Sequence, residues 1–240
     1  MMIDQRPAAT GERHRGRIVE AAFKLLTEQG RDAVSTRSVS AAAGVQAPVI
    51  YRLFGDKNGL LDAVAAHGFA AHLAQKKTLK PSDDPVEDLR AGWDLNISFA
   101  LANPALYALI YGDPRPGAPM AAAQEGLQIL RDSVHRVAEA GRLRISEDLA
   151  AQMVHAAGCG TALALLAQPA GRRDAALSKA NREAVMAAII TNGASAQTGT
   201  GTVDLVTTAV ALRAVLPRTT ALTDRERALL EEWLERLAEA

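Results

Sequence analysis

The chain has 240 residues, of which 48% are hydrophobic, 22% are charged and 4% are aromatic. It carries 27 Lys and Arg and 27 Asp and Glu, so its formal net charge is zero and no overall field attracts it to nucleic acid or to an anionic membrane. Its single cysteine excludes an intramolecular disulfide and fits a reducing compartment, so we expect a cytoplasmic protein. The composition also excludes the collagen-like and disordered classes.

The N-terminal segment has no apolar run of the kind that a signal peptide contains, and we expect residues 1–16 to form a flexible arm. The longest apolar runs, residues 161–167 and 184–190, are much shorter than the roughly 20 residues that cross a bilayer. The sequence therefore predicts no contact with a membrane.

Apolar residues recur at helical spacing along nearly the whole chain, and no run alternates for long enough to predict a strand. We therefore expect an all-α fold. The predicted helices cover residues 12 or 17 to 29, 35–43, 46–54, 60–79, 84–102, 103–111, 120–140, 146–168, 174–191, 203–216 and 223–237. Residues 112–119 contain too many prolines and glycines for a helix, and the small polar residues of 192–202 favour a mobile loop.

Several helix ends carry the residues that such ends require. Gly30 follows the first predicted helix, where a left-handed stop is expected, and Asp84 with Pro85 begins the fifth. Thr223 and Glu226 have the spacing of a capping box at the start of the last helix.

Residues 36–54 form two short predicted helices joined by a turn at Gly44. Glycine there can take a positive φ, and the small residues before it let the helices cross closely, as a helix-turn-helix requires. The second helix is then free to present its polar face to a DNA major groove. The alternative is a helical hairpin with a purely structural role. Apolar contacts between the helices are expected from Val39, Ala43, Val45, Ile50 and Phe54.

The local charge agrees with a DNA-binding head. Residues 1–60 contain nine basic and six acidic side chains, and the rest of the chain carries the opposite net charge of −3. A basic head on an acidic body suits a protein whose head alone contacts phosphate. The excess is small, so charge supports the motif and does not establish it.

Over residues 12–65 the sequence resembles the TetR family of bacterial transcriptional repressors. The resemblance rests on Arg17-Ile18-Val19-Glu20-Ala21-Ala22, Gly30, Gly44-Val45, Tyr51-Arg52-Leu53-Phe54, Lys57 and Leu60-Leu61. It implies a helix-turn-helix DNA-binding domain at residues 17–62 and a helical domain at residues 63–240 that binds a ligand and dimerises. It also implies a homodimer that binds DNA through its two heads and binds a small effector. We therefore predict a repressor that binds a pseudopalindromic double-stranded operator and is released by its effector. The mostly apolar, weakly charged body suggests that the effector is a small hydrophobic molecule.

The resemblance also assigns DNA contacts to single residues. The implied phosphate contacts are Thr36, Arg37, Tyr51 and Lys57, and the implied base-reading positions are Gln46, Ala47, Pro48 and Val49. Tyr51 lies off the apolar stripe of its helix, which favours phosphate contact over the alternative of a core aromatic.

Two departures from the family pattern affect DNA reading. The residue after Arg52 is often His in the family, whereas Leu53 here cannot hydrogen-bond to a phosphate. The side chains at residues 47–49 offer methyl contacts to thymine and few hydrogen bonds. Gln46 and Arg52 are therefore the main polar readers, and we expect operator specificity to depend partly on DNA shape.

The C-terminal half resembles the effector domains of one actinobacterial-type subgroup at residues 103–112 and 155–158. Aromatic, histidine and sulfur-containing side chains on the central helices are candidates for an apolar effector pocket, with ordinary core positions as the alternative. These candidates are Trp93, Phe99, Tyr107, Tyr111, Met120, Met153, His155 and Cys159. The spacing of His155 and Cys159 also suits metal chelation, but no third or fourth ligand is evident and we expect no metal.

The predicted helices at residues 147–168 and 174–191 combine Ala, Gly and aliphatic residues with few charges on one side. Small residues permit close helix crossing, so we expect these helices to form a four-helix homodimer interface. Burial within a single chain is the alternative. The final helix, residues 223–238, carries Trp233 among charged residues, and either extends the interface or covers the core.

An enzymatic function is not expected. The sequence has no nucleophile elbow, phosphate loop or HExxH motif, and no carboxylate pair that lacks a simpler surface explanation, so we expect no catalytic residues and no cofactor. A DNA-binding protein without a small-molecule effector, which packages DNA or is controlled by a partner, stays open as an alternative. An operator affinity that no effector changes would favour it.

Overall fold

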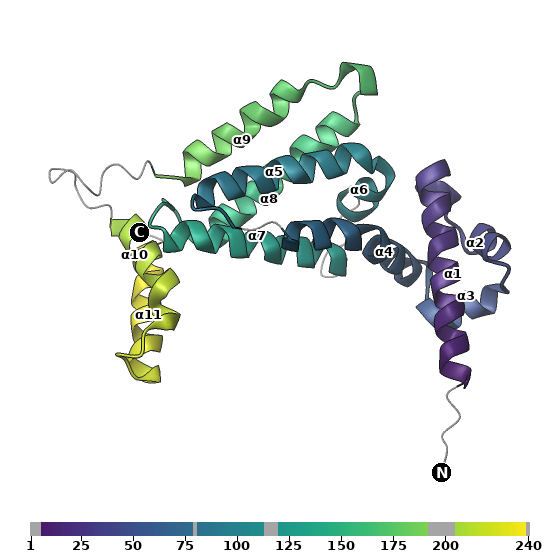
Figure 1. The fold of residues 1–240 in the computed structure, drawn as a ribbon, viewed down its shortest axis with the longest axis horizontal. Helices are drawn as coiled ribbons and strands as arrows, with labels where there is room; N and C mark the ends of the chain where they lie inside the picture. Colours follow the sequence, from purple (N-terminus) through teal and green to yellow (C-terminus); the bar gives the residue numbers. More distant parts are fainter. Residues whose placement is uncertain (1–5, 79–80, 113–119, 192–204, 239–240) are drawn as a thin grey trace, which may run out of the picture. The chain divides into compact units, whose positions relative to one another are not determined.

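The computed structural model describes residues 6–78, 81–112, 120–191 and 205–238 of the chain. Within these residues the regular structure consists of α-helices and short 3-10 helices (Figure 1). One isolated antiparallel bridge within them joins Leu143 to Ile190. The predicted all-α fold is confirmed.

The helix boundaries agree closely with the predicted ones, except at the start of the first helix. The α-helices of the described residues are α1 (Arg6–Gln29), α2 (Thr36–Ala43), α3 (Ala47–Phe54), α4 (Lys57–Thr78), α5 (Pro85–Ala102), α6 (Pro104–Tyr111), α7 (Ala121–Glu139), α8 (Glu147–Leu166), α9 (Ala175–Ile189), α10 (Leu205–Val215) and α11 (Asp224–Ala238).

The predicted flexible arm is wrong for residues 6–16, because α1 already begins at Arg6. Pro7 stands in the first turn of this helix, where its missing N–H is tolerated, and Ala8 and Ala9 favour helix. Residues 1–5 lie outside the described residues, as do the predicted non-helical segment at 113–119 and the predicted loop at 192–202.

The helices group into two compact units. Unit 1 consists of Met1–Thr78 and Phe99–Gly126, and unit 2 consists of Leu79–Ser98 and Leu127–Ala240. This grouping places all of α4 and α6 with α1–α3. The predicted boundary between residues 62 and 63 instead separates DNA binding from ligand binding, and that functional division stays a prediction.

The core of unit 1 is built on α1, which packs against α2, α3, α4 and α6. Ile18, Ala22 and Leu26 on its apolar stripe are fully buried. A Cβ added at Gly68 of α4 would lie 2.5 Å from the Phe23 side chain and 2.7 Å from that of Leu106. The missing side chain at this position therefore lets α4 approach both α1 and α6 closely.

Two polar contacts in the interior of unit 2 join α9 to its neighbours. The buried indole Nε1 of Trp93 on α5 donates to Oγ of Ser178 on α9 at 3.0 Å. The amide of Asn181 on α9 donates to Oγ1 of Thr161 on α8 at 2.9 Å. Because a buried polar group is costly without a partner, these pairs fix the register of α9 on α5 and α8.

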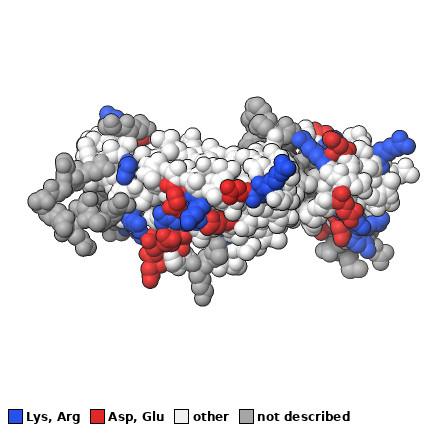
Figure 2. All heavy atoms as spheres, turned by 90° about the horizontal axis from the view of Figure 1, so that it is seen from above, with Lys and Arg blue, Asp and Glu red and all other residues white. Residues whose placement is uncertain are grey.

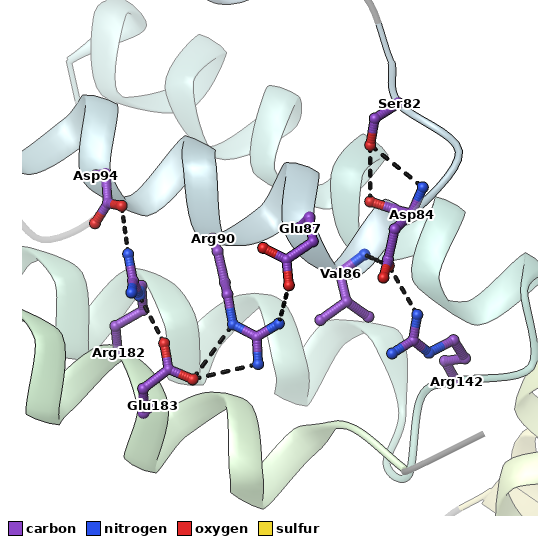
Figure 3. Close-up of polar contacts among 9 residues, drawn as sticks. All are labelled: Ser82, Asp84, Val86, Glu87, Arg90, Asp94, Arg142, Arg182 and Glu183. Atoms are coloured by element: carbon purple, nitrogen blue, oxygen red, sulfur yellow. Dashed lines mark hydrogen bonds and ion pairs between the residues drawn. The ribbon is translucent and has the colours of Figure 1, made fainter. Parts of the chain in front are cut away.

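Partly exposed ion pairs connect α5 to α9 in unit 2 (Figure 3). Glu183 accepts hydrogen bonds from Nε of Arg90 at 3.3 Å and from Nε of Arg182 at 2.9 Å, and Arg182 also pairs with Asp94. Burial raises the pKa of Glu183, but hydrogen bonds from Arg182 and Arg90 outweigh burial and leave that pKa below its usual value. Exposed pairs contribute about 0–1 kcal/mol each, so they orient the helices more than they stabilise them.

The start of α5 is capped as the sequence predicted. Oδ1 of Asp84 accepts from the backbone N–H of Val86 at 2.9 Å and from Nη1 of Arg142 at 2.7 Å (Figure 3). Arg136 on α7 donates to Oδ2 of Asp88 at 2.6 Å. These contacts hold the first turn of α5 against the end of α7.

The last helix covers α10. Leu234 of α11 packs with Ala209 and Leu216, and the predicted capping box is present, since Thr223 and Glu226 each accept from the other's backbone N–H. Trp233 is 47% exposed. The helix therefore covers core residues with one face and leaves Trp233 accessible on another.

The central helix α8 is unusually apolar for its length. Among the described residues it alone is long and apolar enough to cross a membrane by length and composition, with 39% of its 18-residue window buried in the chain. The sequence analysis considered only uninterrupted apolar runs. This 18-residue window is apolar on average, but polar residues interrupt it. A core helix of a soluble protein meets the same two criteria, so one such helix is weak evidence for a membrane.

Candidate nucleic-acid interface and ligand site

The segment that contains α2 and α3 is a helix-turn-helix, as predicted. Oγ of Ser35 caps α2 by accepting from the backbone N–H of Ser38 at 3.1 Å. In turn, Oγ of Ser38 accepts from the backbone N–H of Ser35 at 3.0 Å. Gly44 ends α2 with a φ of 62°, in the left-handed region that favours glycine. Pro48 stands in the first turn of α3, where helices accept proline.

Two arginines of α1 hold the ends of the two short helices. Nη2 of Arg17 donates to the carbonyl oxygen of Ala43, the last residue of α2, at 2.5 Å. Nη1 of Arg15 donates to the carbonyl oxygen of Leu53 in α3 at 3.0 Å, and its guanidinium lies 4.7 Å from the centre of the Phe54 ring. A cation is favourable at a helix C-terminus, so α1 fixes the position of α3 through charge as well as apolar packing.

One side of α3 is buried and the other is accessible. Ile50 is fully buried, whereas Tyr51 is 51% exposed. Tyr51 is therefore not a core aromatic residue. The other predicted base-reading and polar positions are exposed at Gln46, Pro48 and Arg52 and half-buried at Ala47 and Val49.

The remaining predicted phosphate contacts stand at helix starts. Thr36 is half-buried and Arg37 is exposed in the first turn of α2, and Lys57 is exposed as the first residue of α4. The first backbone N–H groups of a helix favour a nearby phosphate. Each of these side chains is thus at least partly accessible to solvent. Their contacts with DNA stay a prediction.

Lys57 is positioned by a tight junction between α3 and α4. Oδ1 of Asp56 accepts from the backbone N–H of Gly59 at 2.8 Å, and Gly55 has a φ of 79°. A Cβ added at Gly59 would lie 2.0 Å from the carbonyl oxygen of Phe54. The junction therefore requires a residue without a side chain at this position.

Charge alone does not mark the interface. On the face drawn in Figure 2, basic and acidic side chains stand beside one another, and no large area carries a single sign. This agrees with the small basic excess of residues 1–60. The exposed side of α3 is a stronger indication of the interface than the distribution of charge.

The predicted effector residues fall in both units. Phe99, Tyr107 and Tyr111 belong to an aromatic cluster of unit 1, in which the rings of Tyr107 and Tyr111 have centroids 4.7 Å apart. Met120, also in unit 1, is buried. Trp93 in unit 2 is buried and bound to Ser178, which indicates a structural role.

The remaining three predicted effector residues lie on α8 in unit 2. Met153, His155 and Cys159 are half-buried there, and Sγ of Cys159 lies 3.8 Å from Nδ1 of His155. No group of three or more metal-ligating side chains occurs within the described ranges. The effector pocket as a whole stays a prediction.

One buried polar residue of unit 1 was not among the site residues predicted from the sequence. His72 on α4 is 4% exposed, and its ring stacks on Phe99 with centroids 4.1 Å apart. Phe69 lies three residues earlier on the same helix, and the centroids of its ring and that of His72 are 5.0 Å apart. The spacing between Phe69 and His72 was the available signal, since it places the histidine on an apolar helix face.

Unit 2 contains a cavity of about 250 Å³ with a mainly charged lining. His135 in this lining contacts the carboxylates of Glu147 at 2.9 Å and Glu139 at 3.5 Å. None of the predicted effector residues lines it. The lining residues are Arg131, His135, Glu147, Asp148, Arg213, Ala214, Pro217 and Glu231.

Comparison with known proteins agrees with this architecture. The family model for bacterial regulatory proteins of the tetR family matches residues 18–64, which include α2, the turn and α3. The tetracycline repressor protein class A from transposon 1721 of Escherichia coli is 36% identical over 104 residues, covering 42% of this chain and 46% of the repressor. Residues 18–64 therefore carry the DNA-binding domain of the tetR family.

Other relatives extend the likeness beyond the head. The HTH-type transcriptional regulator Rv1816 of Mycobacterium tuberculosis is 28% identical over 156 residues, covering 59% of this chain and 64% of Rv1816. A tetR family transcription regulator from Shewanella sp. PV-4 superposes with a TM-score of 0.59 at 18% identity, covering 74% of this chain and 98% of that one, which shows a shared fold. The chain spans about half to two thirds of the length of the two curated relatives.

Proposed function

We propose that this protein is a transcriptional repressor that binds a pseudopalindromic DNA operator as a homodimer and is released by a small effector. The observation that carries the proposal is the helix-turn-helix whose second helix, α3, is buried at Ile50 and exposed at Tyr51 and Arg52. An α-helix with one accessible side fits the DNA major groove. A cytoplasmic location follows from this role, because the operator lies there.

The exposed residues divide into two kinds of DNA contact in this proposal. Thr36, Arg37, Tyr51 and Lys57 hold phosphates, and Gln46 with Arg52 reads base edges. Ala47, Pro48 and Val49 pack against thymine methyl groups. Phosphate contacts set affinity on any sequence, whereas base contacts set the preference among sequences.

Substitution of single α3 residues tests this division. We expect Tyr51→Ala to weaken binding roughly tenfold on operator and random DNA alike, because a hydrogen bond to a charged group is lost. Gln46→Ala should instead narrow the difference between operator and random DNA. The operator is first selected from fragmented genomic DNA, and affinities are then measured by fluorescence anisotropy at one salt concentration.

Tyr51→Phe is the matched control, since it keeps the ring and removes only the hydroxyl group. It should reproduce most of the loss that Tyr51→Ala causes. Equal losses on operator and random DNA for both the Tyr51 and the Gln46 variants would contradict the proposed division.

The proposed dimer interface lies on α8 and α9. Apolar α8 is only 39% buried over its 18-residue window, which leaves apolar surface for a partner to cover. Small residues are exposed along both helices, so two copies can approach closely. They are Ala156, Gly160 and Ala164 on α8 and Ala176, Ala180, Ala184 and Ala187 on α9.

A charge placed on this surface should separate the subunits. We expect Ala156→Glu to weaken dimerisation at least tenfold, because the carboxylate would be buried without a partner. Sedimentation equilibrium measures the change. Ala66→Glu, at an exposed alanine of α4, serves as the control and should leave the dimer intact. Unchanged dimers of Ala156→Glu would exclude this face of α8 as the interface.

Release by an effector is supported by kinship with the tetracycline repressor, whose name identifies its ligand. We propose that the effector is small and apolar and rotates α4, the helix that follows the helix-turn-helix. A coupling of about 1 to 3 kcal/mol is sufficient for a useful switch. The alternative, a DNA-binding protein without an effector, predicts an operator affinity that small molecules leave unchanged.

A further inference from the structure

The charged cavity of unit 2 lies where four helices meet. In its lining, Arg131 belongs to α7, Arg213 belongs to α10 and Glu231 belongs to α11. Glu147 and Asp148 line it from the first turn of α8. Pockets for drug-sized molecules have volumes of roughly 300–1,000 Å³, so a cavity of about 250 Å³ suits a smaller ligand.

The two arginines of this cavity are loosely paired. Nε of Arg131 lies 3.8 Å from Oδ1 of Asp148, and Nη2 of Arg213 lies 3.4 Å from Oε1 of Glu235. A strong charge-assisted hydrogen bond from nitrogen to oxygen measures about 2.7–2.9 Å. Because a guanidinium group has several N–H donors, both arginines can bind an added carboxylate without losing these contacts.

The carboxylates of the cavity differ in what they contact. Glu147 is held by Nδ1 of His135 on α7 at 2.9 Å. Asp148 makes the long contact with Arg131. The side chain of Glu231 has no ion pair or hydrogen bond within the described part of the chain. Asp148 and Glu231 are therefore available to a positive group.

We propose that the charged cavity binds a short aliphatic molecule with a carboxylate at one end and an ammonium group at the other. The guanidinium groups of Arg131 and Arg213 bind the carboxylate. The side chains of Asp148 and Glu231 bind the ammonium group. The site goes beyond the proposed function, because it lies in unit 2, whereas the helix-turn-helix and α4 lie in unit 1.

The lining favours a ligand with both charges over a ligand with one. A simple anion meets the carboxylates of α8 and α11 as well as the arginines, and a simple cation meets two guanidinium groups as well as the carboxylates. Ala214 and Pro217 lie in the same lining and provide an apolar surface for the aliphatic chain. The ligand therefore needs its two charges separated by methylene groups.

A ligand in this cavity also connects the last two α-helices to the rest of unit 2. The helices α10 and α11 pack on each other through Ala209 and Leu234. Arg218, which follows α10, pairs with Glu139 of α7 at 3.0 Å. A ligand held from α7, α8, α10 and α11 adds a second link of this kind. We therefore expect slower amide hydrogen exchange in α10 and α11 when the cavity is occupied.

Three probes with the same six-carbon chain test the proposal by calorimetric titration of the full-length protein at pH 7 and low salt. They are 6-aminohexanoate, which carries both charges, hexanoate, which carries only the negative one, and hexylamine, which carries only the positive one. We expect 6-aminohexanoate to bind at least fivefold more tightly than either of the others. It alone should slow hydrogen exchange in α10 and α11.

Two substitutions separate the contacts of the two charges. In Glu231→Gln the advantage of 6-aminohexanoate over hexanoate should fall at least threefold, because the ammonium group loses a partner. In Arg213→Gln the advantage over hexylamine should fall by a similar factor. Glu231 makes no ion pair within the described residues, so its substitution tests the site without breaking a contact of the fold.

Glu232→Gln is the matched control. Glu232 is the next residue of α11, is exposed, and does not line the cavity. Its substitution changes the net charge by the same amount as Glu231→Gln and should leave the preference for 6-aminohexanoate unchanged. Failure of 6-aminohexanoate to bind, equally tight binding of hexanoate or hexylamine, or equal effects of Glu231→Gln and Glu232→Gln would overturn the proposal.

Discussion

Replacing Gly59 by alanine is expected to destabilise the protein by about 3 kcal/mol, the upper end of the usual cost of overpacking. The added Cβ would lie 2.0 Å from the carbonyl oxygen of Phe54, and this obstacle is backbone rather than the flexible end of a side chain. The α3–α4 junction must therefore open, and the bond from the Gly59 N–H to Oδ1 of Asp56 weakens with it. Thermal unfolding should show a fall in Tm of about 10 °C.

Gly16→Ala is the matched control for this substitution. Gly16 lies inside α1 and is exposed, and a Cβ added there would meet no atom within 4 Å. Alanine there should raise stability by about 0.5–1 kcal/mol, because it restricts the unfolded chain and favours helix. A Gly59→Ala protein that melts like the wild type would show that the junction rearranges at no cost in stability.

Most of the fold could be predicted because its determinants are local. Gly44 and Asp84 act within their own turns, so their capping roles were predictable from neighbouring residues and are confirmed. The start of α1 was not predicted, because a polar and basic segment has no apolar periodicity, although its alanines favour helix. The spacing of apolar residues predicts the buried face of a helix more reliably than it predicts the residue at which the helix begins.

The candidate site was harder to predict because it depends on contacts between distant residues. Trp93 was expected to face an effector, but its partner Ser178 is 85 residues away and nothing near Trp93 in sequence indicates that bond. His72 was missed because a single histidine among the apolar residues of a helix belongs to no recognisable sequence motif. Its significance depends on Phe99 of another helix and on the absence of a partner for Nε2 among the described residues.

Replacing His72 by phenylalanine is expected to improve stability in acid. Burial, followed by the charge of Lys76, lowers the pKa of His72 in the folded protein to about 4 from 6.5. Well above pH 6.5 the imidazole is neutral in both states and contributes no pH dependence. As the pH falls from 6.5 to 4, the unfolded chain takes up a proton that the folded protein refuses, so the free energy of unfolding decreases by up to about 3 kcal/mol.

Urea unfolding of the wild type and His72→Phe at intervals between pH 7.5 and 4 measures this contribution as a difference, which cancels the carboxylates that titrate in the same range. The curves should run parallel near pH 7.5 and separate as the pH falls through 6.5. Over this range the free energy of unfolding should fall less in the variant than in the wild type. His67→Phe removes an exposed histidine of α4 and should track the wild type throughout. If the wild type and His72→Phe stay parallel down to pH 4, then His72 is protonated in the folded protein at the same pH as in the unfolded chain. It would therefore be solvated rather than enclosed by the aromatic cluster.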